Sequence, residues 1–213
     1  DSAHQPTRGG RNSMSQIGLP FDWQEQGSPG QFIAGEANRL AVAHIERWRE
    51  WPIPISVLSG PPRSGKSALG QYFAALSGGT VIDEATSESD DTLFHRWNIA
   101  RDSGVPLLLI ACEPPEGWRV MLPDLRSRLA AAPHLRIEEP DDALLRALLE
   151  TGLARAGSAY APDVPEWLSR HMERSYAALA STLDTLNRTS LSSGRKISIA
   201  STKEALHNSH IFS

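Results

Sequence analysis

The sequence predicts an α/β fold, in which helices cover a parallel sheet and a small C-terminal domain made only of helices follows. Three observations lead to this prediction. Short apolar runs alternate with helical patterns over residues 31–139, as in strands joined by crossover helices. A glycine-containing turn at residues 60–67 lies between one such run and one such helix. After Pro140 the apolar runs stop and only helical periodicity remains.

The first domain contains the alternating elements. We expect its helices over 38–48, 67–76, 92–103 and from Leu122-Pro123 onward, and its strands over 55–59, 80–83, 107–111 and 135–137. Between the first two strands there is room for one helix and a turn at Ser77-Gly78-Gly79. The sheet is therefore expected to lack one edge strand, which is tolerable because an edge strand pairs on one side only.

The second domain and the N-terminal region complete the division of the chain. Helices are expected over 141–156, 165–173, 176–191 and 202–207. We divide the chain into a flexible leader (1–15) whose native origin stays open, a flexible tail (16–30), a nucleotide-binding base (31–139) and a helical domain (140–213).

Composition narrows the class of protein. Hydrophobic residues make up 40% of the chain, yet no apolar run approaches the roughly 20 residues that cross a bilayer, so we expect a cytoplasmic protein without a membrane partner. The net charge of −4 argues against a broad DNA-binding surface, and we expect no direct sequence-specific DNA binding. The single cysteine, Cys112, is expected in the core at a strand end.

A phosphate-binding loop is the most informative motif. Residues 60–67 read Gly60-Pro61-Pro62-Arg63-Ser64-Gly65-Lys66-Ser67, a complete G-x-x-x-x-G-K-[ST] pattern. Its backbone N–H groups would surround a phosphate, while Lys66 reaches the β- and γ-oxygens and the Ser67 hydroxyl binds Mg²⁺. A chance match is the alternative, but a strand pattern before the loop and a helix pattern after it favour a nucleotide site.

Two further motifs suit the same chemistry. Asp83 and Glu84 end a short apolar strand, where Asp83 would hold Mg²⁺ and Glu84 would orient or deprotonate an attacking water. Arg126 and Arg128 lie on a short helix before the last strand, from where an arginine can reach the γ-phosphate of a neighbouring molecule. The alternatives are a solvated strand end for the acids and a solvated helix face for the arginines.

The tail contains a short apolar island, Gln16-Ile17-Gly18-Leu19-Pro20-Phe21, between polar stretches. A glutamine followed by two apolar anchors, Leu19 and Phe21, suits a peptide that docks into a hydrophobic cleft of a partner. The alternative is a tail that packs on its own domain.

These motifs resemble one known family over residues 16–206. Phe32–Ala41 resembles the segment that opens the AAA+ domain of the bacterial replication initiator DnaA, Leu122–Leu129 resembles its arginine-finger helix, and Leu183–Leu186 its lid helix. The chain resembles most the Hda family of DnaA-homologous regulators, because it ends soon after the lid and Gln16-x-x-Leu19-Pro20-Phe21 resembles peptides that bind the sliding clamp.

The resemblance implies a role for each matching residue. Phe32 and Ile33 would contact the adenine of ADP or ATP, and its phosphates would be bound by the loop residues Gly60, Pro61, Arg63, Ser64, Gly65 and Lys66. Ser67 and Asp83 would hold Mg²⁺, and Glu84 would lie beside the attacking water. The sliding clamp would be bound by Gln16, Leu19, Pro20 and Phe21. Arg128 would act in trans, as a finger on ATP held by DnaA.

Two positions depart from the family pattern. Ile110 stands where the first sensor has a threonine, and Ala177 where the second sensor has an arginine, with Arg174 as the nearby substitute. Neither Ile nor Ala can hydrogen-bond a γ-phosphate. We therefore expect intrinsic ATP hydrolysis to be weak or absent.

The resulting hypothesis is an AAA+ regulator of replication initiation that, bound to the β sliding clamp of DNA polymerase III, stimulates hydrolysis of DnaA-bound ATP and inactivates the initiator. Its partners would be DnaA and the clamp, and homo-oligomerisation stays open. Two alternatives remain: a self-sufficient AAA+ ATPase of the clamp-loader or helicase-loader type, and a non-enzymatic clamp-binding adaptor.

Overall fold

A computed structural model describes residues 16–17, 32–157 and 159–207 of the chain. Four parallel strands form the main sheet in the order β4-β5-β3-β6. Their bounds are β3 (Ile55–Ser59), β4 (Thr80–Ile82), β5 (Leu107–Ala111) and β6 (His134–Arg136). A separate antiparallel pair joins β1 (Gln16–Ile17) to β2 (Phe32–Ile33). The α/β class with a four-stranded parallel sheet is confirmed, and among the described residues no strand lies between β3 and β4.

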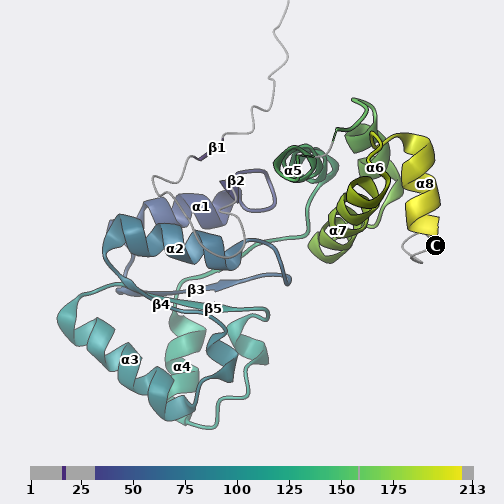
Figure 1. Ribbon diagram of the computed structural model, residues 1–213. Coiled ribbons are helices and arrows are strands. Elements are labelled where there is room, and N and C mark those ends of the chain that lie inside the picture. The colour runs from purple at the N-terminus through teal and green to yellow at the C-terminus, as the bar shows by residue number, and fades with distance from the viewer. Residues whose placement is uncertain (1–15, 18–31, 158, 208–213) are drawn as a thin grey trace, which may run out of the picture.

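Helices cover both faces of this sheet (Figure 1). Their bounds are α1 (Arg39–Glu46), α2 (Lys66–Ser77), α3 (Asp90–Ser103) and α4 (Pro123–Ala131), with short 3₁₀ helices at Trp48–Glu50, Ala85–Ser87 and Pro115–Gly117. Side chains of α1 and α2 pack with Leu58, Leu108 and Ile110, whereas those of α3 and α4 pack with Val57 and Leu109. The central strands β3 and β5 are buried along their whole length because both faces are covered.

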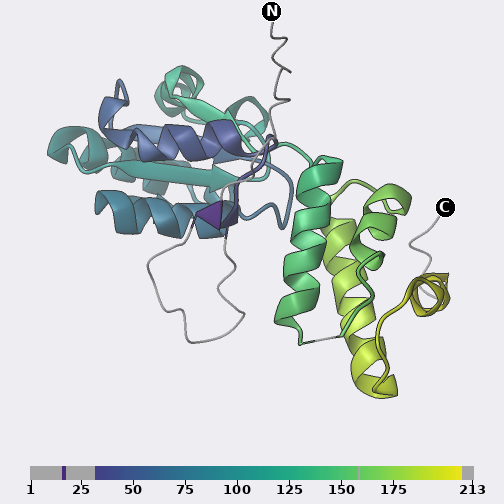
Figure 2. The same cartoon turned by 90° about the horizontal axis from the view of Figure 1, so that it is seen from above.

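The C-terminal part is a helical bundle beside the sheet (Figure 2). It comprises α5 (Asp142–Arg155), α6 (Val164–His171), α7 (Tyr176–Ser193) and α8 (Ile199–His207) around one apolar core. Polar caps start its helices: the Asp141 carboxylate accepts the Leu144 N–H, and the Ser175 hydroxyl accepts the Ala178 N–H. In the described chain, no helix is long and apolar enough to cross a membrane.

Most expected elements lie within three residues of the observed ones. Helix α8 begins at Ile199, three residues before the predicted start, since Ser198 and Ser201 each accept the other's backbone N–H and cap it. The prediction for Cys112 is wrong, because β5 ends at Ala111 and the cysteine that follows is exposed.

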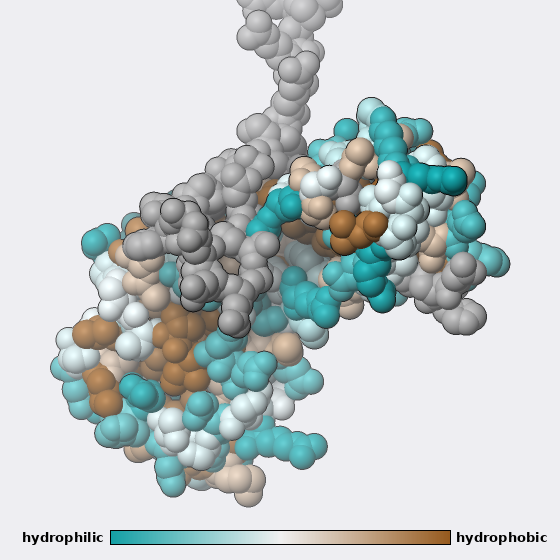
Figure 3. All heavy atoms as spheres, viewed as in Figure 1, coloured by the Kyte–Doolittle hydropathy of each residue, from teal (hydrophilic) through white to brown (hydrophobic). Residues whose placement is uncertain are grey.

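In Figure 3, apolar residues gather where β4 forms the open edge of the sheet.

Candidate functional site

The phosphate-binding loop joins the end of β3 to the start of α2. Gly65 precedes the helix with a positive φ of 87°, a conformation that favours glycine. Gly60 lies so close to the end of β6 that an added Cβ would be 2.8 Å from the carbonyl oxygen of Ile137. The first N–H groups of α2 have no partner within the helix and face the loop. The glycines thus hold the loop in a tight turn at the carboxyl edge of the sheet.

Lys66 lies inside this turn, with 8% of its surface exposed. Its ammonium donates to the carbonyl oxygens of Gly60 at 2.8 Å and Pro61 at 2.6 Å. Burial lowers the pKa of Lys66, and the smaller effects of Cys112 and Asp83 raise it. Both residues follow parallel strands, β5 and β4, whose carboxyl ends meet at the same edge of the sheet. This edge therefore gathers a lysine, an aspartate and a thiol.

The two acids after β4 are both exposed. The Asp83 carboxylate accepts the backbone N–H of Glu84 at 2.9 Å, and Glu84 has a left-handed backbone with φ 52°. Over the described residues, no cluster of three or more His, Cys, Asp or Glu side chains could hold a metal ion. A Mg²⁺ at this edge would need the Ser67 hydroxyl and phosphate oxygens in addition to Asp83, so the metal-binding role of Ser67 and Asp83 stays a prediction.

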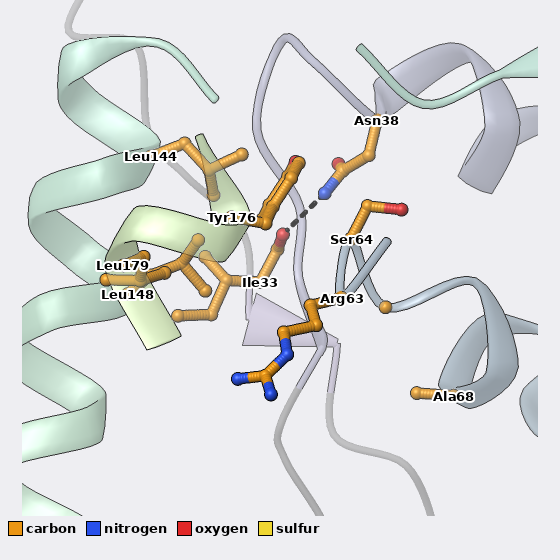
Figure 4. Close-up of a pocket in the computed structure, with 10 residues that line it drawn as sticks. Ile33, Asn38, Arg63, Ser64, Ala68, Leu144, Leu148, Tyr176 and Leu179 are labelled. Carbon is orange, nitrogen blue, oxygen red and sulfur yellow. Dashed lines mark hydrogen bonds between the residues drawn. The ribbon is translucent and has the colours of Figure 1, made fainter. Parts of the chain in front are cut away.

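A pocket of about 160 Å³ opens beside the loop, between the sheet domain and the helical bundle (Figure 4). Ile33, Ala68, Leu144, Leu148 and Leu179 give it apolar walls, and Asn38, Arg63, Ser64, Gly65 and Tyr176 complete its lining. Asn38 fixes the strand that bears Ile33, because its side-chain amide donates to the Ile33 carbonyl and accepts the Gly35 N–H, both at 2.9 Å. An apolar slot beside a phosphate loop suits an adenine base.

Two polar atoms at this pocket are buried without a hydrogen-bond partner among the described residues, the Ser64 hydroxyl and the Tyr176 hydroxyl. Burial, with smaller effects from Glu139 and Asp141, raises the pKa of the Tyr176 phenol. Unpaired buried polar groups are costly, so their presence here fits a ligand that brings polar atoms. Sequence reasoning missed Asn38 and Tyr176. The helix-capping Ser175 marked the start of α7, but no local pattern showed that the next residue faces the pocket.

Arg128 lies between α3 and α4, on the face of the sheet opposite to α1 and α2. Its guanidinium donates to the Asp124 carboxylate through Nε at 2.9 Å and Nη2 at 2.7 Å, and through Nη1 to the Asn98 amide oxygen at 2.9 Å. The Phe94 ring supports it at 4.7 Å, and 24% of the side chain stays exposed. Arg126 points elsewhere and donates to the Val120 carbonyl oxygen.

The sequence of the helical bundle matches a known family model. Residues 141–206 match the family model described as Hda, lid domain. The lid of this chain is therefore similar to the lid domain of Hda. The fold agrees, since domain III of the replication initiation protein DnaA from Thermotoga maritima superposes with a TM-score of 0.69 at 14% identity, covering 82% of this chain and 93% of that one.

Other solved structures share the AAA+ fold. DnaA from Aquifex aeolicus bound to AMPPCP has a TM-score of 0.56 at 18% identity, and the match covers 72% of this chain but 62% of that chain. RuvB from Thermotoga maritima has a TM-score of 0.60 at 13% identity, covering 83% and 70%. This chain thus spans less than two thirds of the longer DnaA structure and combines an AAA+ base with a lid that matches the Hda lid model.

The two positions expected to match the family's sensors bear side chains without hydrogen-bonding groups. Ile110 is fully buried and packs against Gly70 of α2 rather than facing the loop. Ala177 is exposed at the start of α7. Arg174, the nearby substitute, forms an ion pair with Asp142 at 2.7 Å. The residue of this segment that lies near Lys66 is Cys112, which follows β5, and not Ile110, which lies within the strand.

The predicted clamp-binding residues lie mostly outside the described part of the chain, as Leu19, Pro20 and Phe21 do. The backbone of Gln16 is described and pairs antiparallel with β2, opposite Ile33. The flexible tail that we expected therefore begins with two residues paired to the strand whose Ile33 lines the pocket beside the phosphate loop.

Proposed function

We propose that this chain, bound to the sliding clamp, stimulates hydrolysis of ATP on DnaA and thereby inactivates the initiator. The observation that carries the proposal is the Hda lid at residues 141–206, joined to a DnaA-like AAA+ base. The position of Arg128 on α4 of that base supports it, as does the clamp-type peptide beginning at Gln16.

The pocket beside the phosphate loop is proposed to hold ADP or ATP. Ile33 would contact the adenine, and the buried hydroxyls of Ser64 and Tyr176 offer partners to polar atoms of the nucleotide. Lys66 would exchange its bonds to the Gly60 and Pro61 carbonyls for phosphate oxygens. A bound Mg²⁺ would offset phosphate charge. This nucleotide would serve a structural role, since Ile110 and Ala177 leave the γ-phosphate without sensors.

Arg128 is proposed to act on the ATP of DnaA rather than on the chain's own nucleotide. A guanidinium beside the γ-phosphate stabilises the charge of the transition state and accelerates hydrolysis by about 10³–10⁵. Asp124, Asn98 and Phe94 fix the direction of the side chain, so the group arrives at an interface already oriented. The Arg128 side chain is 24% exposed, and this exposed part is where a phosphate group of the partner would bind.

The test measures ATP hydrolysis by DnaA with clamp loaded on DNA, in the presence and absence of this protein. Arg128→Ala should abolish the stimulation while leaving clamp binding intact. Arg96→Ala is the matched control, because Arg96 is exposed on α3 and lies about 200° around that helix from Phe94 and from Asn98. Full stimulation by Arg128→Ala would favour the adaptor, whereas brisk ATP turnover by the protein alone would favour a self-sufficient ATPase.

A further inference from the structure

A second cavity lies within the lid, apart from the nucleotide pocket. It has a volume of about 480 Å³ and opens between the C-terminal half of α7 and helix α8. Leu186 and Ile197, both buried, form an apolar floor, and Ser190 and Ser193 lie on the α7 side. This volume falls within the range of small-molecule sites, roughly 300–1,000 Å³.

The loop that closes this cavity is held at both ends. Helix α7 ends at Ser193, and the next residue, Gly194, has φ 63° and donates its N–H to the Ser190 carbonyl at 2.9 Å. Ile197 donates its N–H to the Ala159 carbonyl and accepts the Ala161 N–H, both at 2.8 Å. The backbone of Arg195 and Lys196 is therefore fixed between two anchored points, and both side chains line the cavity.

The charge of this region is opposite to that of the whole chain. Residues 195–207 contain the cations Arg195, Lys196 and Lys203 against the single acid Glu204, although the chain carries a net charge of −4. No ion pair with an acid is found for Arg195 or Lys196 within the described residues. Glu204 also lines the cavity and would limit how much negative charge a ligand can bring.

We propose that this lid cavity binds the phosphate group of a nucleotide, either free or within a DNA single strand. The planar fork of Arg195 and the ammonium of Lys196 match phosphate oxygens. The Ser193 hydroxyl accepts the Arg195 N–H at 3.3 Å and keeps its own proton to donate. The apolar floor of Leu186 and Ile197 accommodates a sugar or base. This binding does not depend on the proposed function, because neither Arg128 nor the phosphate loop takes part.

The test is a titration followed by amide NMR, which reports each site separately. Adenosine monophosphate and a short oligo-dT single strand are the two probes. Shifts of the Gly194 and Ile197 amides report the lid cavity, while those of Gly65 and Lys66 report the phosphate loop. The Arg195→Ser/Lys196→Ser double variant should weaken the lid response at least about tenfold. The Arg155→Ser/Arg188→Ser variant removes the same charge from exposed lid positions outside the cavity and should leave the response unchanged.

The two probes distinguish the sources of the phosphate. If a single strand is the ligand, oligo-dT binds more tightly than the monophosphate, and the double variant lowers the salt dependence by about 1.4 in log K against log salt, at roughly 0.7 per cation. If a free nucleotide is the ligand, the monophosphate binds at least as well. The proposal is overturned if neither probe shifts Gly194 and Ile197, or if the double variant and its control respond alike.

Discussion

Replacing Ile110 by threonine tests whether the first sensor can be restored by one substitution. Ile110 is fully buried, and the ideal Cβ position on Gly70 of α2 lies 2.6 Å from its Cδ1. Ile110→Thr removes one buried methyl group and places a hydroxyl in an apolar contact. The lost burial costs about 0.5–1.5 kcal/mol, as for Ile→Val, and an unpaired hydroxyl adds about 1–3 kcal/mol. We expect the variant to lose about 1.5–4.5 kcal/mol of unfolding free energy and to gain no ATPase activity.

Urea denaturation measures the free energy of unfolding, and steady-state phosphate release measures ATP turnover by the protein alone. Ile110→Val is the control, since it removes one methylene without adding a hydroxyl and should cost about 0.5–1.5 kcal/mol. A threonine variant as stable as the valine variant, and with raised ATP turnover, would refute the reasoning. That result would mean that residue 110 can turn its side chain toward the phosphate loop.

Three further outcomes are expected. Lys66→Ala should weaken binding of ADP, because the substitution removes a charge held inside the phosphate loop; unchanged affinity in calorimetry would count against this role. The combined substitutions Leu19→Ala and Phe21→Ala should abolish retention of the protein on immobilised clamp, since burial of each side chain contributes about 2 kcal/mol to binding. If the double variant is still retained, the peptide is not the docking element. Burial lowers the pKa of His44 and His134 below 6.5, so the unfolded chain binds more protons as the pH falls below that value. The urea midpoint should therefore drop from pH 7 to pH 5, and less so when both histidines are replaced by glutamine; a flat profile would contradict this sign.

The elements that sequence predicted best are those set by local patterns. The loop at residues 60–67 lies between β3 and α2 as expected, because its glycines, lysine and flanking apolar run are contiguous. The helical bundle could also be predicted, since α5 and α7 combine polar caps with apolar periodicity. The four-stranded sheet followed from the short spacing between Lys66 and Asp83.

Residues that depend on packing between distant segments could not be predicted in this way. Tyr176 reaches the nucleotide pocket because α7 packs against the base, and Asn38 because its amide bridges back to Ile33. The exposed position of Cys112 follows from where β5 ends, which an apolar run alone does not fix. Arg128 was a candidate from the sequence alone, but its partners on α3 were not, because Asn98 and Phe94 are thirty or more positions earlier in the chain.

The pocket beside the phosphate loop and the Arg128 side chain lie in separate parts of the AAA+ base. The pocket beside the phosphate loop is lined by residues of β2, the loop, α2, α5 and α7 and by Asn38, whereas Arg128 is held between α3 and α4, on the face of the sheet opposite to α1 and α2. None of the contacts of Arg128 includes a residue of the pocket. Under the proposed function, a change at Arg128 is therefore expected to remove the effect on DnaA while ADP or ATP stays bound to this chain. The loss of both sensors is compatible with such an arrangement, because a finger that acts in trans needs an ordered α3–α4 face but no hydrolysis in its own domain.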